Sequence, residues 1–199
     1  MPRSTEQLEQ IRKQKKAHIR QTALELFAEH GFHATSISQI SKKAKISKGL
    51  IYNYFESKDD ILEDVFDWAF SNIYADMDVN KDGLLSEKEF IRFIKTSIHS
   101  TLKNKAFWKL YSALVFQPHI LETYTAKYEH KAKEIVGLIR GFIASQGSIS
   151  PDKDLFAISS LLKGANLILL TAPDFFPVEN LEKNTIDACF KLISKNHKP

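Results

Sequence analysis

Apolar side chains recur three or four residues apart along nearly the whole chain, a spacing that places them on one face of an α-helix. Ile19, Ala23, Leu26 and Phe27 form the buried stripe of a first helix that ends at Gly31. The same spacing predicts later helices over about 61–73, 88–102, 104–116, 119–146, 151–171 and 177–196. No segment shows the strict alternation typical of a β-strand, so the pattern predicts an all-α protein.

Two short helices around a tight turn are predicted in the segment from Thr35 to Lys58. Ser36 is a good N-cap for a helix over 37–44, whose apolar positions fall on one side. The turn follows at 45–46, and Ser47 is a natural N-cap for the second helix. A helix, a tight turn and a second helix form the arrangement that lays a helix in the DNA major groove.

The second short helix is predicted to have one face buried in the core and another free to contact a binding partner. Leu50, together with Tyr54 or Phe55, is expected to anchor it to the core. The residues left to face a partner are Lys48, Gly49, Ile51, Tyr52 and Asn53. Glycine in an early helical turn costs about 1 kcal/mol relative to alanine, so close approach of a DNA phosphate explains Gly49 better than helix stability does.

Charge is unevenly divided between the two ends of the chain. Residues 1–58 carry 11 Lys and Arg against 5 Glu, a net charge of +6, whereas residues 59–199 carry 17 against 19, a net charge of −2. The excess of positive charge therefore lies at the predicted DNA-binding end. Four basic residues are expected to precede the first helix and either to follow the phosphate backbone or to form a solvated tail: Arg12, Lys13, Lys15 and Lys16.

The N-terminal segment resembles, nearly residue for residue, the DNA-binding domain of the TetR family of bacterial regulators. The matching residues are Leu26, Phe27, Glu29, Gly31, Phe32, Thr35, Ser36, Ile40, Ala44, Ile46, Ser47, Gly49, Leu50, Tyr52, Tyr54, Phe55, Ser57 and Lys58. The chain departs from the family pattern at Ser41, Lys45 and Tyr54. Because Lys45 replaces the usual turn glycine, it is expected to adopt a less comfortable backbone angle.

The resemblance implies a three-helix DNA-binding domain at residues 1–58 and a helical regulatory and dimerisation domain at residues 59–199. It also implies phosphate contacts by Thr35, Ser36, Ser47, Tyr54 and Lys58, which leaves the partner-facing residues of the second helix for base edges. Replacing Lys58 by alanine should then weaken binding to all sequences alike. A homodimer formed mainly by the last two helices would place two recognition helices about 34 Å apart on a symmetric operator.

Core and dimer interface are expected to share the apolar residues of these last two helices. They are Leu155, Ile158, Leu161, Leu162, Ala165, Leu169, Ile186, Cys189, Phe190 and Ile193.

Residues 78–89, with the sequence DVNKDGLLSEKE, satisfy the spacing of an EF-hand calcium loop. Such a loop brings alternating oxygen atoms onto one hard cation, while Gly83 permits the sharp turn. The candidate ligands are Asp78, Asn80, Asp82, Leu84 through its carbonyl, Ser86 and Glu89. Five key positions would match by accident in about one chain per thousand.

The same residues also fit an ordinary helix start. Ser86 and Glu89 form the Ser-x-x-Glu pattern of a capping box, and Asn, Asp and Gly are common loop residues. EF-hands usually occur in pairs, and no second loop is present in the sequence. Both interpretations therefore stay open, and no cofactor is required apart from this candidate calcium ion.

Aromatic residues are concentrated in the part of the chain that follows. They are Phe107, Trp108, Tyr111, Phe116, Tyr124 and Tyr128. The resemblance implies a small-molecule effector pocket there, for which an apolar or aromatic effector is expected, although such residues more often form core. No catalytic motif is present, so the chain is not expected to be an enzyme.

A single cysteine, Cys189, excludes an internal disulfide framework and favours a reducing compartment. No apolar run of membrane-spanning length and no signal segment is expected, which indicates a cytoplasmic protein without a membrane partner. The sequence thus predicts a dimeric DNA-binding transcriptional regulator, most simply a repressor released by a small effector and modulated by calcium. The alternative is a calcium-binding sensor whose helix-turn-helix docks another protein.

Overall fold

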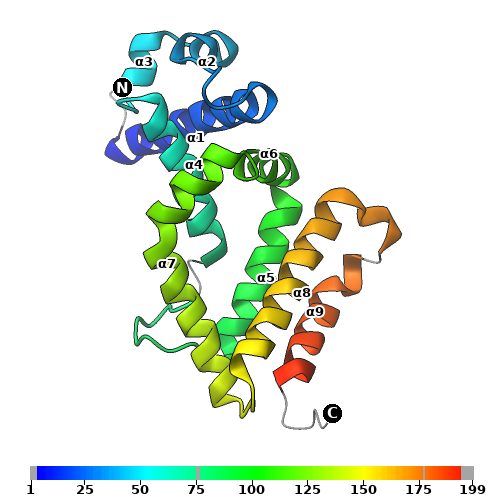
Figure 1. The fold of residues 1–199 in the computed structure, drawn as a ribbon. Coiled ribbons are helices and arrows are strands. Elements are labelled where there is room, and N and C mark those ends of the chain that lie inside the picture. The colour runs from blue at the N-terminus through cyan, green and yellow to red at the C-terminus, as the bar shows by residue number, and fades with distance from the viewer. Residues whose placement is uncertain (1–3, 75–76, 177, 194–199) are drawn as a thin grey trace. The chain divides into compact units, whose positions relative to one another are not determined.

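Helices make up all the regular structure in the residues that the computed structural model describes, namely 4–74, 77–176 and 178–193. In chain order they are α1 (Thr5–His30), α2 (Ile37–Ala44), α3 (Lys48–Tyr52), α4 (Lys58–Tyr74), α5 (Glu87–Lys103), α6 (Lys105–Val115), α7 (Pro118–Ser145), α8 (Pro151–Thr171), the 3-10 turn η1 (Pro173–Phe175) and α9 (Val178–Ile193) (Figure 1). The expectation of an all-α fold, with a helix-turn-helix at the N-terminal end, is confirmed.

The chain forms two compact units. Unit 1 consists of the described residues within 1–69 and 106–122, and unit 2 of those within 70–105 and 123–199. Unit 1 therefore contains α1 to α3, most of α4 and nearly all of α6, so it extends beyond residue 58. The functional boundary at residue 58 stays a prediction.

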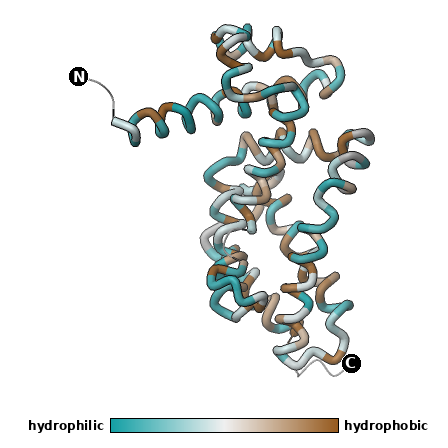
Figure 2. The backbone as a smooth tube through the Cα atoms, turned by 90° about the vertical axis from the view of Figure 1, so that its left-hand side faces the viewer, coloured by the Kyte–Doolittle hydropathy of each residue, from teal (hydrophilic) through white to brown (hydrophobic). Residues whose placement is uncertain are grey.

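Helix α1 begins earlier than expected, at Thr5. Ser4 caps it in a capping box, because the Ser4 side chain accepts a hydrogen bond from the Gln7 backbone and the Gln7 side chain accepts one from the Ser4 backbone. The expectation that the basic cluster precedes the first helix is therefore wrong, since residues 12–16 lie inside α1. The N-terminal part of α1 is mainly hydrophilic (Figure 2).

Within unit 1, a carboxylate joins α1 to α4. Asp64 of α4 accepts a hydrogen bond from Arg20, at 2.9 Å, and forms an ion pair with Lys16, at 2.7 Å. Burial lowers the pKa of the Arg20 guanidinium, and the Asp64 charge opposes this effect. The Arg20 guanidinium also lies 5.0 Å from the ring centre of Trp68, so α1 covers the next turn of α4 as well.

Aromatic rings join α4 to α6 in the same unit. The ring centres of Trp68 and Phe107 are 4.2 Å apart, and those of Phe66 and Tyr111 are 5.4 Å apart in an edge-on arrangement. At the end of α6, the Gln117 side-chain amide donates a 3.0 Å hydrogen bond to the Phe27 carbonyl of α1. Helix α6 is thereby packed with α1 and α4.

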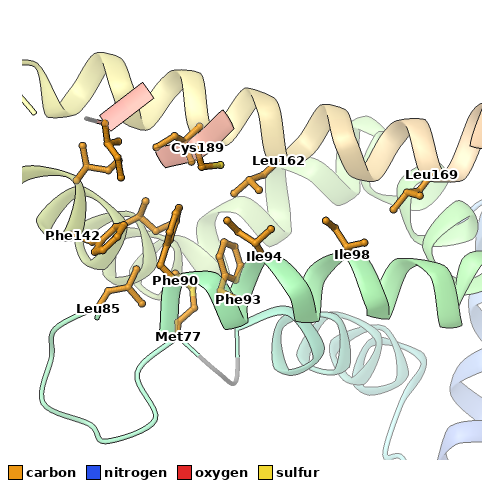
Figure 3. Close-up of a cluster of buried hydrophobic side chains, with 14 residues drawn as sticks. Met77, Leu85, Phe90, Phe93, Ile94, Ile98, Phe142, Leu162, Leu169 and Cys189 are labelled. Atoms are coloured by element: carbon orange, nitrogen blue, oxygen red, sulfur yellow. The ribbon is translucent and has the colours of Figure 1, made fainter. Parts of the chain in front are cut away.

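Unit 2 has its own apolar core, in which α5, α8 and α9 lie against one another (Figure 3). Its buried members are Met77, Leu85, Phe90, Phe93, Ile94, Ile98, Ile139, Phe142, Ile143, Ile158, Leu162, Leu169, Cys189 and Ile193. A polar network also crosses from α8 to α5, where Asn166 accepts a hydrogen bond from Thr101 at 2.6 Å and donates one to Ser97 at 3.0 Å. This satisfied network fixes the register of the two helices.

Helix α8 is long and apolar enough, by length and composition alone, to cross a membrane. This corrects the expectation that no segment reaches such a length. Only 28% of its most apolar stretch is buried. The helix nevertheless packs on α5 and α9 and places Asn166 in the polar network, which is the behaviour of a core helix with one uncovered face.

Candidate DNA-binding surface and calcium loop

Helix α2 is fixed by its cap and by two charged neighbours. The Ser36 side chain accepts a 3.3 Å hydrogen bond from the Gln39 backbone, and the Gln39 side chain accepts one of 2.7 Å from the Ser36 backbone. Lys43 forms ion pairs with Glu25 and Glu29 of α1, at 3.2 and 3.3 Å. The positive charge of Lys43 is thus partly neutralised within the protein, whereas Lys42 is exposed.

The turn between α2 and α3 has the backbone strain expected from the sequence. Lys45 adopts a left-handed conformation with φ of 55°, the position at which the family usually has glycine. The Ile46 backbone then donates a 3.1 Å hydrogen bond to the Ser41 carbonyl. Ser47 caps α3 by accepting a hydrogen bond from the Leu50 backbone, at 3.1 Å, as predicted.

The exposed face of α3 contains four of the five residues predicted to face base edges. Lys48, Gly49 and Asn53 are exposed, and 54% of the Tyr52 side chain is accessible. A hydroxyl, an amide and an ammonium therefore lie on or beside one short helical surface, together with a glycine that permits close approach. This combination suits the polar edges of bases in a DNA groove.

The fifth residue, Ile51, does not face a partner. Its side chain is completely buried, and Phe55 one turn later is also buried, whereas Leu50 and Tyr54 are only partly covered. The residues buried in the core therefore lie one position later in the sequence than Leu50 and Tyr54. The assignment of Ile51 to base edges is wrong because α3 contains too few turns for sequence spacing to identify its buried face.

Two residues predicted to contact phosphate are instead engaged inside the protein. Thr35 is buried, and its hydroxyl donates to the carbonyls of Leu26 and Gly31, at 3.2 and 2.9 Å. Lys58 donates to the carbonyls of Phe32 and Thr35, at 2.7 and 2.8 Å. Both side chains stabilise the turn between α1 and α2, through contacts that no local sequence pattern indicates.

The remaining predicted phosphate contacts lie at the surface. Ser36 and Ser47 are exposed N-caps, at the positive ends of α2 and α3. Tyr54 is partly buried, and the Arg12 guanidinium lies 5.5 Å from its ring centre. Arg12 was missed as a neighbour of the recognition helix because its position depends on the early start of α1.

The candidate calcium loop wraps around its first carboxylate. Asp78 accepts hydrogen bonds from the backbones of Asp82 and Gly83, both at 3.1 Å. Lys81 and Gly83 both have positive φ angles, of 56° and 74°, which produce the sharp turn. Met77, just before the loop, and Leu85, within it, point into the core of unit 2 (Figure 3).

Glu89 serves as a helix cap in this structure. Its carboxylate accepts hydrogen bonds from the Ser86 hydroxyl at 2.6 Å, the Ser86 backbone at 2.9 Å and the Val79 backbone at 3.0 Å. These hydrogen bonds, chiefly the one from the Ser86 hydroxyl, lower the pKa of Glu89. Within the described part of the chain, no three His, Cys, Asp or Glu side chains converge as a metal site would require.

The predicted effector residues divide between the two units. Phe107, Trp108 and Tyr111 form an aromatic cluster in unit 1, whereas the stacked rings of Tyr124 and Tyr128 belong to unit 2. Phe116 is largely exposed. The assignment of these residues to an effector pocket stays a prediction.

Cys189 shows no sign of reactivity. It is buried in the unit 2 core, and desolvation raises the pKa of its thiol to about 12, so the thiolate needed for nucleophilic attack is disfavoured.

Comparisons with known proteins point to one family. Residues 19–65 match the family described as bacterial regulatory proteins, tetR family. An uncharacterised HTH-type transcriptional regulator of Bacillus subtilis, YuxN, is 40% identical over 63 residues, which is 32% of this chain and 22% of that protein. The HTH-type transcriptional repressor Rv3405c of Mycobacterium tuberculosis is 43% identical over 51 residues, which is 26% of this chain and 27% of that protein.

These alignments span only about a quarter of each relative. The fold likeness extends further, because a TetR-like transcriptional regulator from Rhodococcus sp. RHA1 superposes with a TM-score of 0.66 at 18% identity, covering 96% of this chain and 97% of that one. The matched segment 19–65 contains α2, α3 and the residues that pack them against α1 and α4. Over this segment the chain is similar to the tetR family of bacterial regulatory proteins, and over its whole length it shares the fold of a TetR-like regulator.

Proposed function

We propose that the protein is a transcriptional regulator that binds a two-fold symmetric DNA operator as a homodimer. The observation that carries the proposal is the exposed face of α3, where Lys48, Gly49, Tyr52 and Asn53 lie on the second helix of a helix-turn-helix. The net charge of +6 on residues 1–58 supplies the attraction to phosphate. Repression is the simplest form of regulation, and one relative of similar sequence is named a repressor.

The remaining expectations form part of the same proposal. The protein acts in the cytoplasm without a cofactor, and a small apolar or aromatic effector releases it from DNA. The stacked rings of Phe70, Tyr124 and Tyr128 in unit 2 support an effector of this chemistry, with ring centres 4.9 and 5.9 Å apart.

Selection of duplexes from a random-sequence library tests the DNA-binding proposal. A regulator of this kind enriches one palindromic sequence, and its affinity for that duplex exceeds the affinity for a scrambled duplex by about a thousandfold or more. A protein that uses its helix-turn-helix to dock another protein has no reason to discriminate among sequences. Absence of enrichment at low salt would therefore favour the docking alternative.

Gly49 gives a sharper test of the α3 surface. A Cβ atom at this position would meet only the Ser47 hydroxyl oxygen, at 3.9 Å, so the protein itself tolerates alanine. Gly49→Ala should raise the free energy of unfolding by about 0.5–1 kcal/mol, because alanine is the better helix former. It should also weaken binding to the selected duplex by about tenfold or more, because the methyl group blocks close approach.

Chemical denaturation and fluorescence anisotropy measure these two effects of Gly49→Ala. The matched control is Gly137→Ala, an exposed glycine inside α7 whose added Cβ meets no atom within 4 Å. The control should gain stability without losing DNA affinity. Unchanged affinity in Gly49→Ala would show that α3 does not approach the duplex closely.

The uncovered face of α8 supports the homodimer. Phe156 and Leu167 are 75% and 57% exposed, and they lie three helical turns apart on the same face, with Ser160 and Lys163 between them. Most of the residues expected to divide between core and interface lie in or against the core of unit 2, as Leu162 and Phe190 do. A second copy of this face would remove both large side chains from water.

Leu167→Lys should therefore dissociate the dimer. A new charge at a large apolar position that the partner copy would cover costs about 2 kcal/mol or more, which raises the dimer dissociation constant about 30-fold. Sedimentation velocity across a concentration series measures the shift. Ile149→Lys is the control, because Ile149 is 89% exposed but precedes α8. Equal dissociation constants for Leu167→Lys and the unmodified protein would place the interface elsewhere.

We also propose that the loop at residues 78–89 binds calcium and modulates the regulator. Three observations support this: the EF-hand spacing of Asp78, Asn80, Asp82 and Glu89, the backbone turn around the Asp78 carboxylate, and the burial of Met77 and Leu85 in the core. The loop precedes α5 and follows α4, which runs from unit 1 into unit 2. Calcium would thus act on the helix that carries Asp64.

Glu89→Gln separates the metal ligand from the helix cap. Glutamine at this position preserves the Ser-x-x-Gln form of the capping box but removes the carboxylate that would hold calcium through two oxygens. Calorimetric titration of metal-stripped protein with calcium should give saturable heat that disappears in Glu89→Gln. Glu87→Gln, an exposed neighbour with the same charge change, should retain it.

Thermal unfolding provides a second measurement of the calcium proposal. Calcium at 100 times its dissociation constant should stabilise the unmodified protein by about 2.7 kcal/mol. Absence of heat and of stabilisation in the unmodified protein would leave Glu89 as a helix cap only.

A further inference from the structure

Lys58, the first residue of α4, is bound by the turn between α1 and α2. Its ammonium nitrogen lies 2.7 Å from the Phe32 carbonyl oxygen, 2.8 Å from that of Thr35 and 3.4 Å from that of His33. An ammonium group has three N–H donors, and these carbonyls can occupy all of them. The nitrogen also lies 4.3 Å from the ring centre of Phe32, which covers one side of it.

The turn that Lys58 holds determines where α2 begins. Gly31 ends α1 with a positive φ of 86°, and the buried Thr35 hydroxyl donates back to the carbonyls of Leu26 and Gly31. Ser36, the N-cap of α2, follows directly. Without the Lys58 ammonium as a donor, the carbonyls of this turn would lie together at the negative end of α1.

We propose that Lys58 is a positioning residue for DNA binding and does not itself contact phosphate. Its ammonium holds the turn so that Ser36 and the N-terminal end of α2 are placed to receive the DNA backbone. Helix α4, through its first residue, therefore sets the position of α2. This inference rests on the proposed function, because it assigns a role within the same DNA-binding surface.

The salt dependence of DNA binding distinguishes the two roles of Lys58. Each phosphate contact contributes about 0.9 to the slope of log affinity against log salt concentration. Lys58→Met should weaken binding to the selected duplex about tenfold while leaving this slope unchanged. A slope that becomes shallower by about 1.8, one lost contact in each protomer of the dimer, would overturn the proposal, because it would show direct phosphate contact. Lys42→Met, at an exposed lysine of α2, is the control for loss of one positive charge.

A double-mutant cycle tests whether Lys58 acts through the turn. Ser36→Ala and Lys58→Met should be non-additive in their effect on affinity, because both disturb the start of α2. Affinity is measured at a temperature at which circular dichroism shows both variants to be fully folded. If Lys58→Met lowers the melting temperature but binds DNA as the unmodified protein does, the residue is merely structural and the positioning role is wrong.

Thermal unfolding tests the contacts of Lys58 with the turn independently of whether the protein binds DNA. Lys58→Met loses the three hydrogen bonds that the ammonium donates to carbonyls. This loss should lower the melting temperature by about 5 °C or more. If the unmodified protein selects no duplex, the proposed function fails, and a lowered melting temperature would still establish the clamp. An unchanged melting temperature together with unchanged affinity would overturn the clamp itself.

Discussion

The ion pair between Arg20 and Asp64 is the contact on which the DNA-binding unit depends most. Both side chains are largely withdrawn from water, so removing either would leave a buried charge without its partner. Asp64 also binds Lys16, and Arg20 covers Trp68, so one carboxylate holds two turns of α1 against two turns of α4. The family-matching segment ends at residue 65, just beyond this carboxylate.

A consequence is that α4 cannot be treated as a simple connection between two domains. Its first residue holds the turn before α2, Asp64 holds α1, and Trp68 packs on Phe107 of α6. After Ala69 the same helix continues into unit 2. A displacement of the first part of α4 would therefore reach α1, α6 and the turn before α2 through these contacts.

The sequence predicted local features well and distant contacts poorly. Ser36, Ser47 and Ser86 cap their helices as expected, because a cap depends on residues within one turn. The buried face of α3 was misplaced because five residues do not define a helical period. The internal roles of Thr35 and Lys58 depend on partners up to 26 residues away, which no local pattern records. The exposed apolar face of α8 was also missed, since spacing alone does not distinguish core from uncovered surface.

Glu89 shows why a complete ligand pattern does not by itself establish a metal site. Its carboxylate already accepts three hydrogen bonds, two of them from Ser86, and a hydrogen bond to a charged group contributes about 1.5–3 kcal/mol. Calcium must replace these contacts, so its affinity would be lower than for a loop whose glutamate is already directed at the ion. The residue after Glu89 is Phe90, which is buried in the unit 2 core. Loss of the Ser86 contacts would uncap α5 in its first turn, next to this buried residue.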